Sequence, residues 1–266
     1  MTAPAPLRAI RAEWTKLRTL PSTTWLISMA ILGTAGLSLA IAGSLDYDHC
    51  DTPCVLDTTK LTLAGVRLTQ IGILVLAVLA TTAEHSTRTI QPTLMAVPRR
   101  LLVVLGKLGV LALLGTATGV LAVAASLEAG RAVLPGNGFT AARGFPALSL
   151  ADDLTRRAAI GTVLYLGLIA LLGAGLGLLL RDTAGALTAA LALLYGSPIV
   201  AMFINDPQWQ HRIHRFSPMD AGLTIQATRN LAAEHIGPWA GIGVLSLYAT
   251  AAVAAGLVVF QFRDAR

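Results

Sequence analysis

Few residues outside the apolar runs have types and spacings that could do chemistry. Cys50 and Cys54 are the two cysteines of the chain, and they lie in the acidic stretch DYDHCDTPC. A C-x-x-x-C spacing in an oxidising compartment can close a small disulfide. With His49 and the nearby aspartates, the two thiols could instead hold a metal ion, although the spacing matches no standard zinc pattern. The disulfide is the better supported of these two interpretations.

A second pair of possible ligands, His211 and His214, lies in the stretch HRIHRF. The i, i+3 spacing can place both side chains on one helical face. No third ligand is evident nearby, so we favour interfacial side chains in a loop over a metal site. Ser217-Pro-Met-Asp220 follows and matches a capping box, which predicts a helix over residues 221–233.

Motifs for catalysis and nucleotide binding are missing from the sequence. There is no G-x-x-x-x-G-K-[ST] to cradle phosphates, no H-E-x-x-H and no G-x-S-x-G. The apolar runs contain no central carboxylate of the kind that proton-driven transporters use. Asp152, Asp153, Arg156 and Arg157 are the one polar cluster that could serve an enzyme at a membrane face, and they fit a solvated helix start better. We expect no catalytic, cofactor or metal site, and no enzyme activity in this chain.

The composition indicates a membrane protein. Of the 266 residues, 55% are hydrophobic and 13% are charged, whereas soluble domains carry about 25% charged residues. Six apolar runs reach the roughly 20 residues that a helix needs to cross the hydrocarbon core. A spanning backbone must satisfy its hydrogen bonds internally, so we expect an all-α membrane protein. The predicted spans are 25–43, 61–83, 101–127, 158–180, 184–204 and 238–260, in a single transmembrane domain covering 25–260.

Charge predicts the orientation of these spans. The formal net charge is +6, and the basic residues flank apolar runs, which favours membrane topology over nucleic-acid binding. With the N-terminus placed inside, the inner segments carry eleven basic and four acidic residues, and the outer segments nine and ten. We therefore expect a multi-pass protein of the plasma (inner) membrane, with both termini and the tail 261–266 in the cytoplasm.

The first 24 residues have a helical pattern of their own. Leu7, Ile10, Trp14 and Leu17 recur at spacings of three and four, with Lys16 and several arginines beside them. The pattern predicts an amphipathic helix on the membrane surface, with Trp14 at the depth of the lipid head groups. An ordinary basic anchor before the first span is the alternative.

Four stretches together resemble the ABC-2 type transporter permeases, especially the small actinobacterial kind. They are AEWTKLRTLPSTTWL (12–26), EHSTRTIQPTLMAVPRR (84–100), LLGAGLGLLLRDTAGAL (171–187) and FSPMDAG (216–222), and they fall along nearly the whole chain. The resemblance implies six transmembrane helices and a dimer with a second permease protomer. It also implies that each protomer docks on a separate P-loop ATPase subunit, which binds ATP and Mg and drives export of a compound or movement of a lipid.

The resemblance also implies residues that contact the ATPase. Glu84 matches the acid that opens the family's coupling loop, and Arg88 stands where glycine is common. We expect a short cytoplasmic coupling helix over about 84–96. The implied coupling residues are Glu84, His85, Arg88, Thr89, Ile90, Arg99 and Arg100, and the implied interface-helix residues are Leu7, Ile10, Trp14, Lys16 and Leu17.

The sequence leaves the substrate open. A hydrophobic or amphipathic drug, antibiotic, peptide or lipid would each suit apolar spans without a distinctive charge. The alternative function is a membrane-embedded enzyme or a lipid-modifying anchor protein, which would need polar catalytic side chains clustered at one membrane face.

Overall fold

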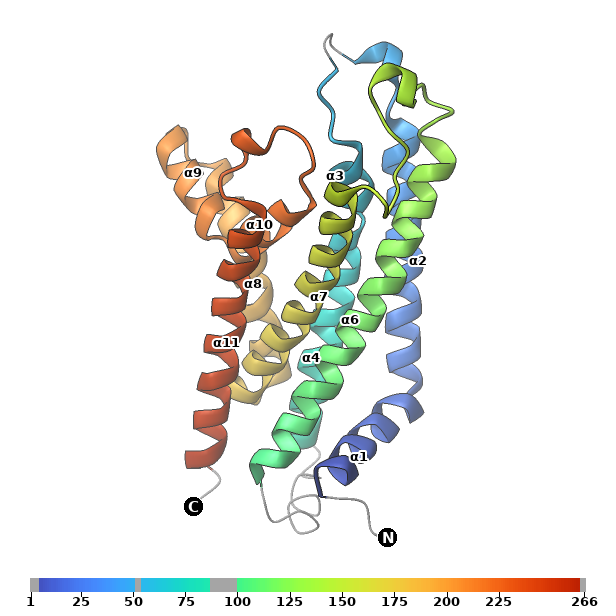
Figure 1. Ribbon diagram of the computed structural model, residues 1–266. Helices are drawn as coiled ribbons and strands as arrows, with labels where there is room; N and C mark the ends of the chain where they lie inside the picture. Colours follow the sequence, from blue (N-terminus) through green and yellow to red (C-terminus); the bar gives the residue numbers. More distant parts are fainter. Residues whose placement is uncertain (1–4, 51–53, 87–99, 264–266) are drawn as a thin grey trace.

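The computed structural model describes residues 5–50, 54–86 and 100–263, and the regular structure in these ranges is entirely helical (Figure 1). Six helical segments are long and apolar enough to cross a membrane. They are α2 (Pro21–Ser44), α3 (Thr58–Leu63) continued by α4 (Val66–Ser86), α6 (Arg100–Val133), α7 (Asp153–Leu180), α8 (Thr183–Met202) and α11 (Pro238–Arg263). The predicted all-α class with six spans is confirmed at this level.

The other helices among the described residues lie at the two ends of the bundle. The end that carries α1 (Ala5–Thr19) also holds the first and last described residues, and we name it the α1 end (Figure 1). The opposite end, named the α9 end, carries α9 (Pro207–Phe216) and α10 (Pro218–Leu223). Four short 3-10 helices also lie there: η1 (Tyr47–His49), η2 (Ala141–Arg143), η3 (Thr224–Gln226) and η4 (Leu231–Ala233).

Several spans are longer than their apolar runs predict. α6 continues to Val133, six residues past the predicted end, and α7 begins at Asp153, five residues before the predicted start. Both extensions are polar helical turns. The second is started by Asp152, whose side chain accepts a hydrogen bond from the backbone N–H of Thr155 at 2.8 Å. Hydropathy finds the part of a helix that meets lipid, whereas capping decides where the helix begins.

α7 is the central helix and packs against α4, α6, α8 and α11 (Figure 1). Tyr165, Leu166, Ile169 and Leu172 on α7 are fully buried at the middle of the core. Small residues on α7 and its neighbours permit this close packing, because they let helix backbones approach one another. By contrast, α2, α8 and α11 have a much smaller share of buried residues than the other three spans.

The predicted helix over 221–233 is wrong in its length. Ser217 does accept a hydrogen bond from the N–H of Asp220, at 3.3 Å, as the capping pattern predicts. However, α10 ends at Leu223, and only η3 follows before the backbone becomes extended at Ala227. The next two N–H groups, of Thr228 and Arg229, donate to the Asp57 carboxylate instead of to helix carbonyls. A tertiary contact thus ends a helix that the local sequence would extend.

α11 approaches α10 closely at Gly241. A Cβ atom at this position would lie 1.8 Å from the carbonyl oxygen of Ala221, a backbone atom that cannot swing away. We expect Gly241→Ala to lower the free energy of unfolding by about 2–3 kcal/mol, as overpacking does. The matched control is Gly243→Ala, on the same helix, where a Cβ atom meets nothing within 4 Å. Unfolding in mixed micelles measures both, and equal stabilities would contradict the described packing.

Candidate functional site

A buried ion pair attaches the surface helix α1 to the transmembrane bundle. Glu13 is 3% exposed, and its carboxylate lies 3.2 Å from the Lys107 ammonium on α6 and 2.9 Å from that of Lys16. Lys107 also donates a hydrogen bond to the carbonyl of Ala80 on α4, at 3.0 Å. We name Glu13, Lys107 and the Ala80 carbonyl the α1 joint. Through it, one lysine connects three helices.

The joint explains how a lysine can lie inside a membrane span. Lys107 lies six residues inside its predicted span, and its long side chain could extend to the lipid head groups. Instead it is 6% exposed and directed into the protein. A buried ammonium needs an opposite charge and further hydrogen-bond partners, and Glu13 and Ala80 provide them. The pattern of α1 gave no sign that its one acidic residue faces the bundle.

The predicted apolar stripe of α1 is divided between two environments. Leu17 is buried in a cluster with Val104 and Leu108 of α6, one turn away from Glu13. Trp14 is 42% exposed and, with Arg11 and Arg18, belongs to the outward face of the helix. The side chains of Leu7 and Ile10 lie outside the described residues. α1 therefore presents one face to α6 and a basic, tryptophan-bearing face to its surroundings.

A cavity adjoins the joint. Its volume is about 320 Å³, and it lies between α1, α2, α4 and α6. Most of its wall is apolar, and Glu13, Lys16 and Lys107 supply the charged part.

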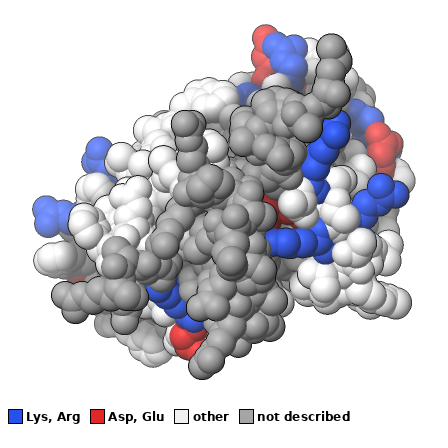
Figure 2. Space-filling view, turned by 90° about the horizontal axis from the view of Figure 1, so that it is seen from below, with Lys and Arg blue, Asp and Glu red and all other residues white. Residues whose placement is uncertain are grey.

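The predicted coupling residues lie in and after the last turn of α4. Glu84 and His85 belong to α4, which continues to Ser86, and Arg100 is the first residue of α6. Arg88, Thr89, Ile90 and Arg99, and with them most of the predicted coupling helix, lie outside the described residues. The described helices place the two ends of the segment 84–100 at the α1 end. Figure 2 views this end, where basic side chains lie around the rim with fewer acidic ones between them.

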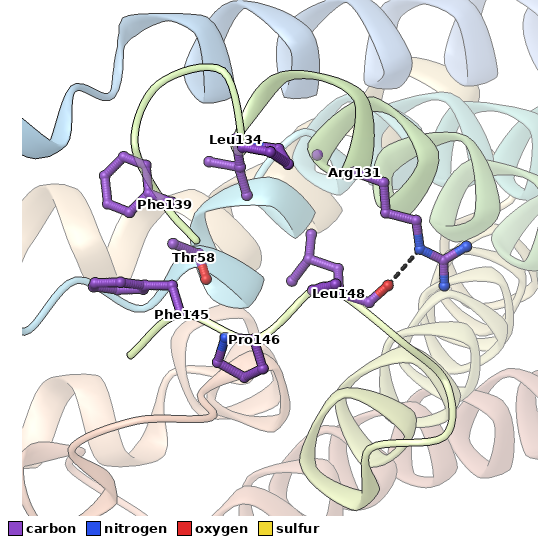
Figure 3. Close-up of a pocket in the computed structure, with 10 residues that line it drawn as sticks. Thr58, Arg131, Leu134, Phe139, Phe145, Pro146 and Leu148 are labelled. Carbon is purple, nitrogen blue, oxygen red and sulfur yellow. Dashed lines mark hydrogen bonds between the residues drawn. The ribbon is translucent and has the colours of Figure 1, made fainter. Parts of the chain in front are cut away.

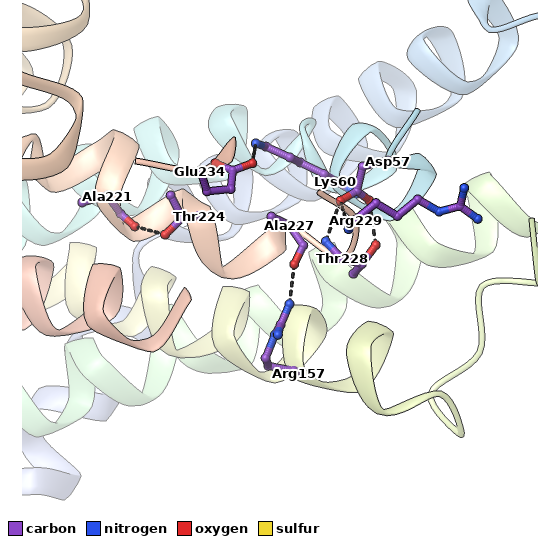
Figure 4. Close-up of polar contacts among 9 residues, drawn as sticks. All are labelled: Asp57, Lys60, Arg157, Ala221, Thr224, Ala227, Thr228, Arg229 and Glu234. Atoms are coloured by element: carbon purple, nitrogen blue, oxygen red, sulfur yellow. Dashed lines mark hydrogen bonds and ion pairs between the residues drawn. The ribbon is translucent and has the colours of Figure 1, made fainter. Parts of the chain in front are cut away.

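A polar clamp at the α9 end joins the segment after α10 to α3. The Asp57 carboxylate accepts hydrogen bonds from the N–H of Thr228, from its hydroxyl at 2.7 Å and from the N–H of Arg229 at 2.9 Å (Figure 4). The same carboxylate caps α3 by accepting from the N–H of Lys60 at 3.0 Å. Lys60 in turn pairs with Glu234. We name these five residues the α9-end clamp.

The Asp57 contacts were not predicted, although an Asp-Thr-Thr start is a recognisable helix cap.

The polar cluster at residues 152–157, which was considered as a possible enzyme site, makes structural contacts. Asp152 caps α7, Asp153 pairs with Arg156, and Arg157 donates to the carbonyl of Ala227 (Figure 4). None of these four side chains converges on a shared cavity with a nucleophile or base in the described structure.

The two predicted histidines meet a third. His214 on α9 stacks on His235 at 5.0 Å between ring centroids, and His211 meets the edge of the same ring at 4.9 Å. His214 is hydrogen-bonded to the Asp220 carboxylate at 2.8 Å. Burial lowers the pKa of His235, and the neighbouring His214 and His211 lower it further. Within the described residues, no group of three or more His, Cys, Asp or Glu side chains is arranged to hold a metal.

The remaining features of the α9 end serve packing. The structure joins Cys50 and Cys54 in a disulfide, with their Cα atoms 5.5 Å apart. A small cavity of about 60 Å³ lies beside Thr58, between Phe139 and Phe145 and the turn at Leu148 (Figure 3). Its size suits a water molecule or two rather than a substrate.

The α1 joint predicts a strong energetic coupling. Lys107→Met removes a partner of a buried carboxylate, and we expect a loss of about 3 kcal/mol in the free energy of unfolding. In a double-mutant cycle with Glu13→Gln, the stability lost by the double variant should be smaller than the sum of the two single losses, by about 1 kcal/mol or more. Glu128→Gln is the control, because the Glu128–Arg131 pair is exposed and worth about 0–1 kcal/mol. Fully additive losses at Glu13 and Lys107 would contradict the joint.

The α9-end clamp predicts a second large effect. Asp57→Ala leaves the N–H groups of Thr228 and Arg229 without their acceptor, and hydrogen bonds to a charged group contribute about 1.5–3 kcal/mol each. We expect Asp57→Ala to lower the free energy of unfolding by about 3 kcal/mol and to speed protease cleavage between α10 and α11. Asp48→Ala should do neither, since the side chain of Asp48 is 78% exposed and its contact with Arg143 is long, at 3.4 Å.

No protein-family profile matches the sequence, and no curated protein gives a significant match. The fold that the chain does possess is that of a six-span helical membrane protein.

Proposed function

We propose that the chain is the membrane-spanning permease subunit of an ATP-binding cassette exporter. In this proposal a separate P-loop ATPase subunit binds ATP and Mg and docks at the α1 end, which faces the cytoplasm. The observation that carries the proposal is the α1 joint. It gives a surface helix a buried, charge-paired connection to two spans, which an ordinary basic anchor would not need.

The joint connects α1 mechanically to two spans. A displacement of α1 would move α6 through the ion pair of Glu13 with Lys107, and it would move α4 through the hydrogen bond from Lys107 to Ala80. These are the two helices that flank the predicted coupling segment 84–100. An ATPase that contacts both α1 and this segment would therefore act on α4 and α6 together. Packed interiors respond to such displacement by moving as units rather than deforming continuously.

A second protomer completes the proposal. α2, α8 and α11 are the least buried spans, and they expose large apolar side chains such as Met29, Leu32 and Leu247. Lipid covers such surfaces in a membrane, and so can another copy of the chain. We propose that the transported compound crosses at the seam between two protomers, whether these are identical or related chains.

The test uses the outward face of α1. Co-expression with the P-loop ATPase subunit proposed as its partner, followed by purification through a tag on this chain, should yield a permease–ATPase complex. Trp14→Ala should lower the amount of ATPase retained by roughly tenfold or more, as loss of an interface tryptophan does. Trp239→Ala is the matched control, because Trp239 is 55% exposed at the opposite end. Glu84→Ala and Arg88→Glu should weaken the coupling of ATP hydrolysis to transport.

Two results would overturn the proposal. One is the absence of any retained ATPase with the unaltered chain, and the other is transport by the purified chain in vesicles without nucleotide. The second result would instead favour a carrier that needs no separate energy source.

A further inference from the structure

Arg67 is a charged side chain exposed on a membrane-spanning helix. It lies in the span Thr58–Ala83, nine residues from the start, which is roughly 13 Å along a helix axis. The side chain is exposed on the outer surface of the bundle. A charge in the hydrocarbon region is costly, and such residues face a polar path or a partner.

Within the described residues, Arg67 has no ion pair or hydrogen bond with another side chain or carbonyl. The other arginines whose side chains are described at the α9 end all have a contact. Arg131, Arg143, Arg156, Arg157 and Arg229 bind carboxylates or carbonyls, and Arg212 and Arg215 lie over aromatic rings. Among the arginines whose side chains are described at this end, Arg67 is thus the one without a carboxylate, a carbonyl or an aromatic ring as a partner.

The groups beside Arg67 add hydrogen-bond donors. One turn along α4, Gln70 is fully buried, donates to the Tyr195 hydroxyl at 3.2 Å and to the sulfur of Met219, and accepts from the Tyr165 hydroxyl. The amide of Gln70 is therefore fully occupied. Tyr195, half-buried on α8, accepts from Gln70, and its own hydroxyl proton has no acceptor among the described residues.

The charges around this position favour an anion. Gln70 follows Arg67 by three residues on α4 and donates to the Tyr195 hydroxyl at 3.2 Å, so Tyr195 lies beside the turn of α4 that carries Arg67. Asp220 of α10 is an acid at this end, but its carboxylate is bound to His214 at 2.8 Å. Arg67 and Tyr195 thus offer a guanidinium and a hydroxyl donor with no acceptor of their own to satisfy them.

We infer that Arg67 and Tyr195 receive the acidic head group of an amphipathic compound at the membrane face of the bundle. The apolar body of the compound lies along α4 toward the α1 end, where Leu68, Ile71 and Leu79 are 37–40% exposed. Guanidinium groups bind phosphate and carboxylate oxygens with paired, charge-assisted hydrogen bonds. That this compound is the one transported rests on the proposed function, and it narrows the substrate class to anionic amphiphiles.

The test measures binding without any ATPase. The purified chain in phosphatidylcholine nanodiscs is titrated with a diazirine-tagged hexadecyl phosphate and with the matching uncharged hexadecanol. The phosphate should label α4 and α8 peptides saturably, and the alcohol should not. Arg67→Gln should weaken phosphate binding roughly tenfold or more, the loss expected for a hydrogen bond to a charged group. Tyr195→Phe should weaken it less, and Arg67→Lys should recover part of the affinity.

Arg156→Gln is the control, since it removes an exposed arginine at the same end and should leave binding unchanged. Equal labelling by the alcohol, or unchanged affinity in Arg67→Gln, would overturn the inference. Displacement of the probe by excess phosphatidylglycerol would support the inference, because this lipid is itself an amphiphile with an acidic head group. None of these results bears on whether the ATPase subunit is retained, so a failure of this inference can be distinguished from a failure of the proposed function.

Discussion

The pair of Glu13 with Lys107 is the contact on which the arrangement of the α1 end depends. Removing two charges from water is costly, and a lone buried ammonium inside a span would be more costly still. Lys107 can occupy the interior because its ammonium group is paired with Glu13, and Glu13 can be 3% exposed because its carboxylate is paired with Lys107. Each charge thereby fixes the place of the helix that carries the other, and α1 cannot rotate about its axis without separating them.

At the α9 end, a single carboxylate, that of Asp57, connects two segments of the chain. Asp57 caps α3 and also receives the backbone of Thr228 and Arg229, which belong to the connection between α10 and α11. Between the two ends, packing of small residues around α7 takes the place of charge. The bundle therefore has charged attachments at both ends, and between them it packs apolar residues together with uncharged polar side chains such as Gln70 and Tyr165.

Hydropathy predicted the six spans because the cost of exposing backbone and charge to lipid is local to each segment. The contacts between segments could not be predicted in the same way. The acidic residue at 13 and the basic residue at 107 are far apart in sequence, and nothing local indicates that they pair. The helix expected over 221–233 was wrong for the same reason, because the acceptor that ends it is Asp57. The cap at Ser217, which needs only neighbouring residues, was predicted correctly.

α4 links the features that a transporter would have to coordinate. It carries Arg67 near the α9 end and Ala80, which accepts from Lys107, near the α1 end. The two residues are thirteen positions apart, about 20 Å along one helix. An α-helix transmits axial displacement over this distance with little loss, since its hydrogen bonds are short and in series. A ligand held at Arg67 and a partner pressing on α1 would then act on the same rigid element, and neither needs a chain of side-chain contacts between them.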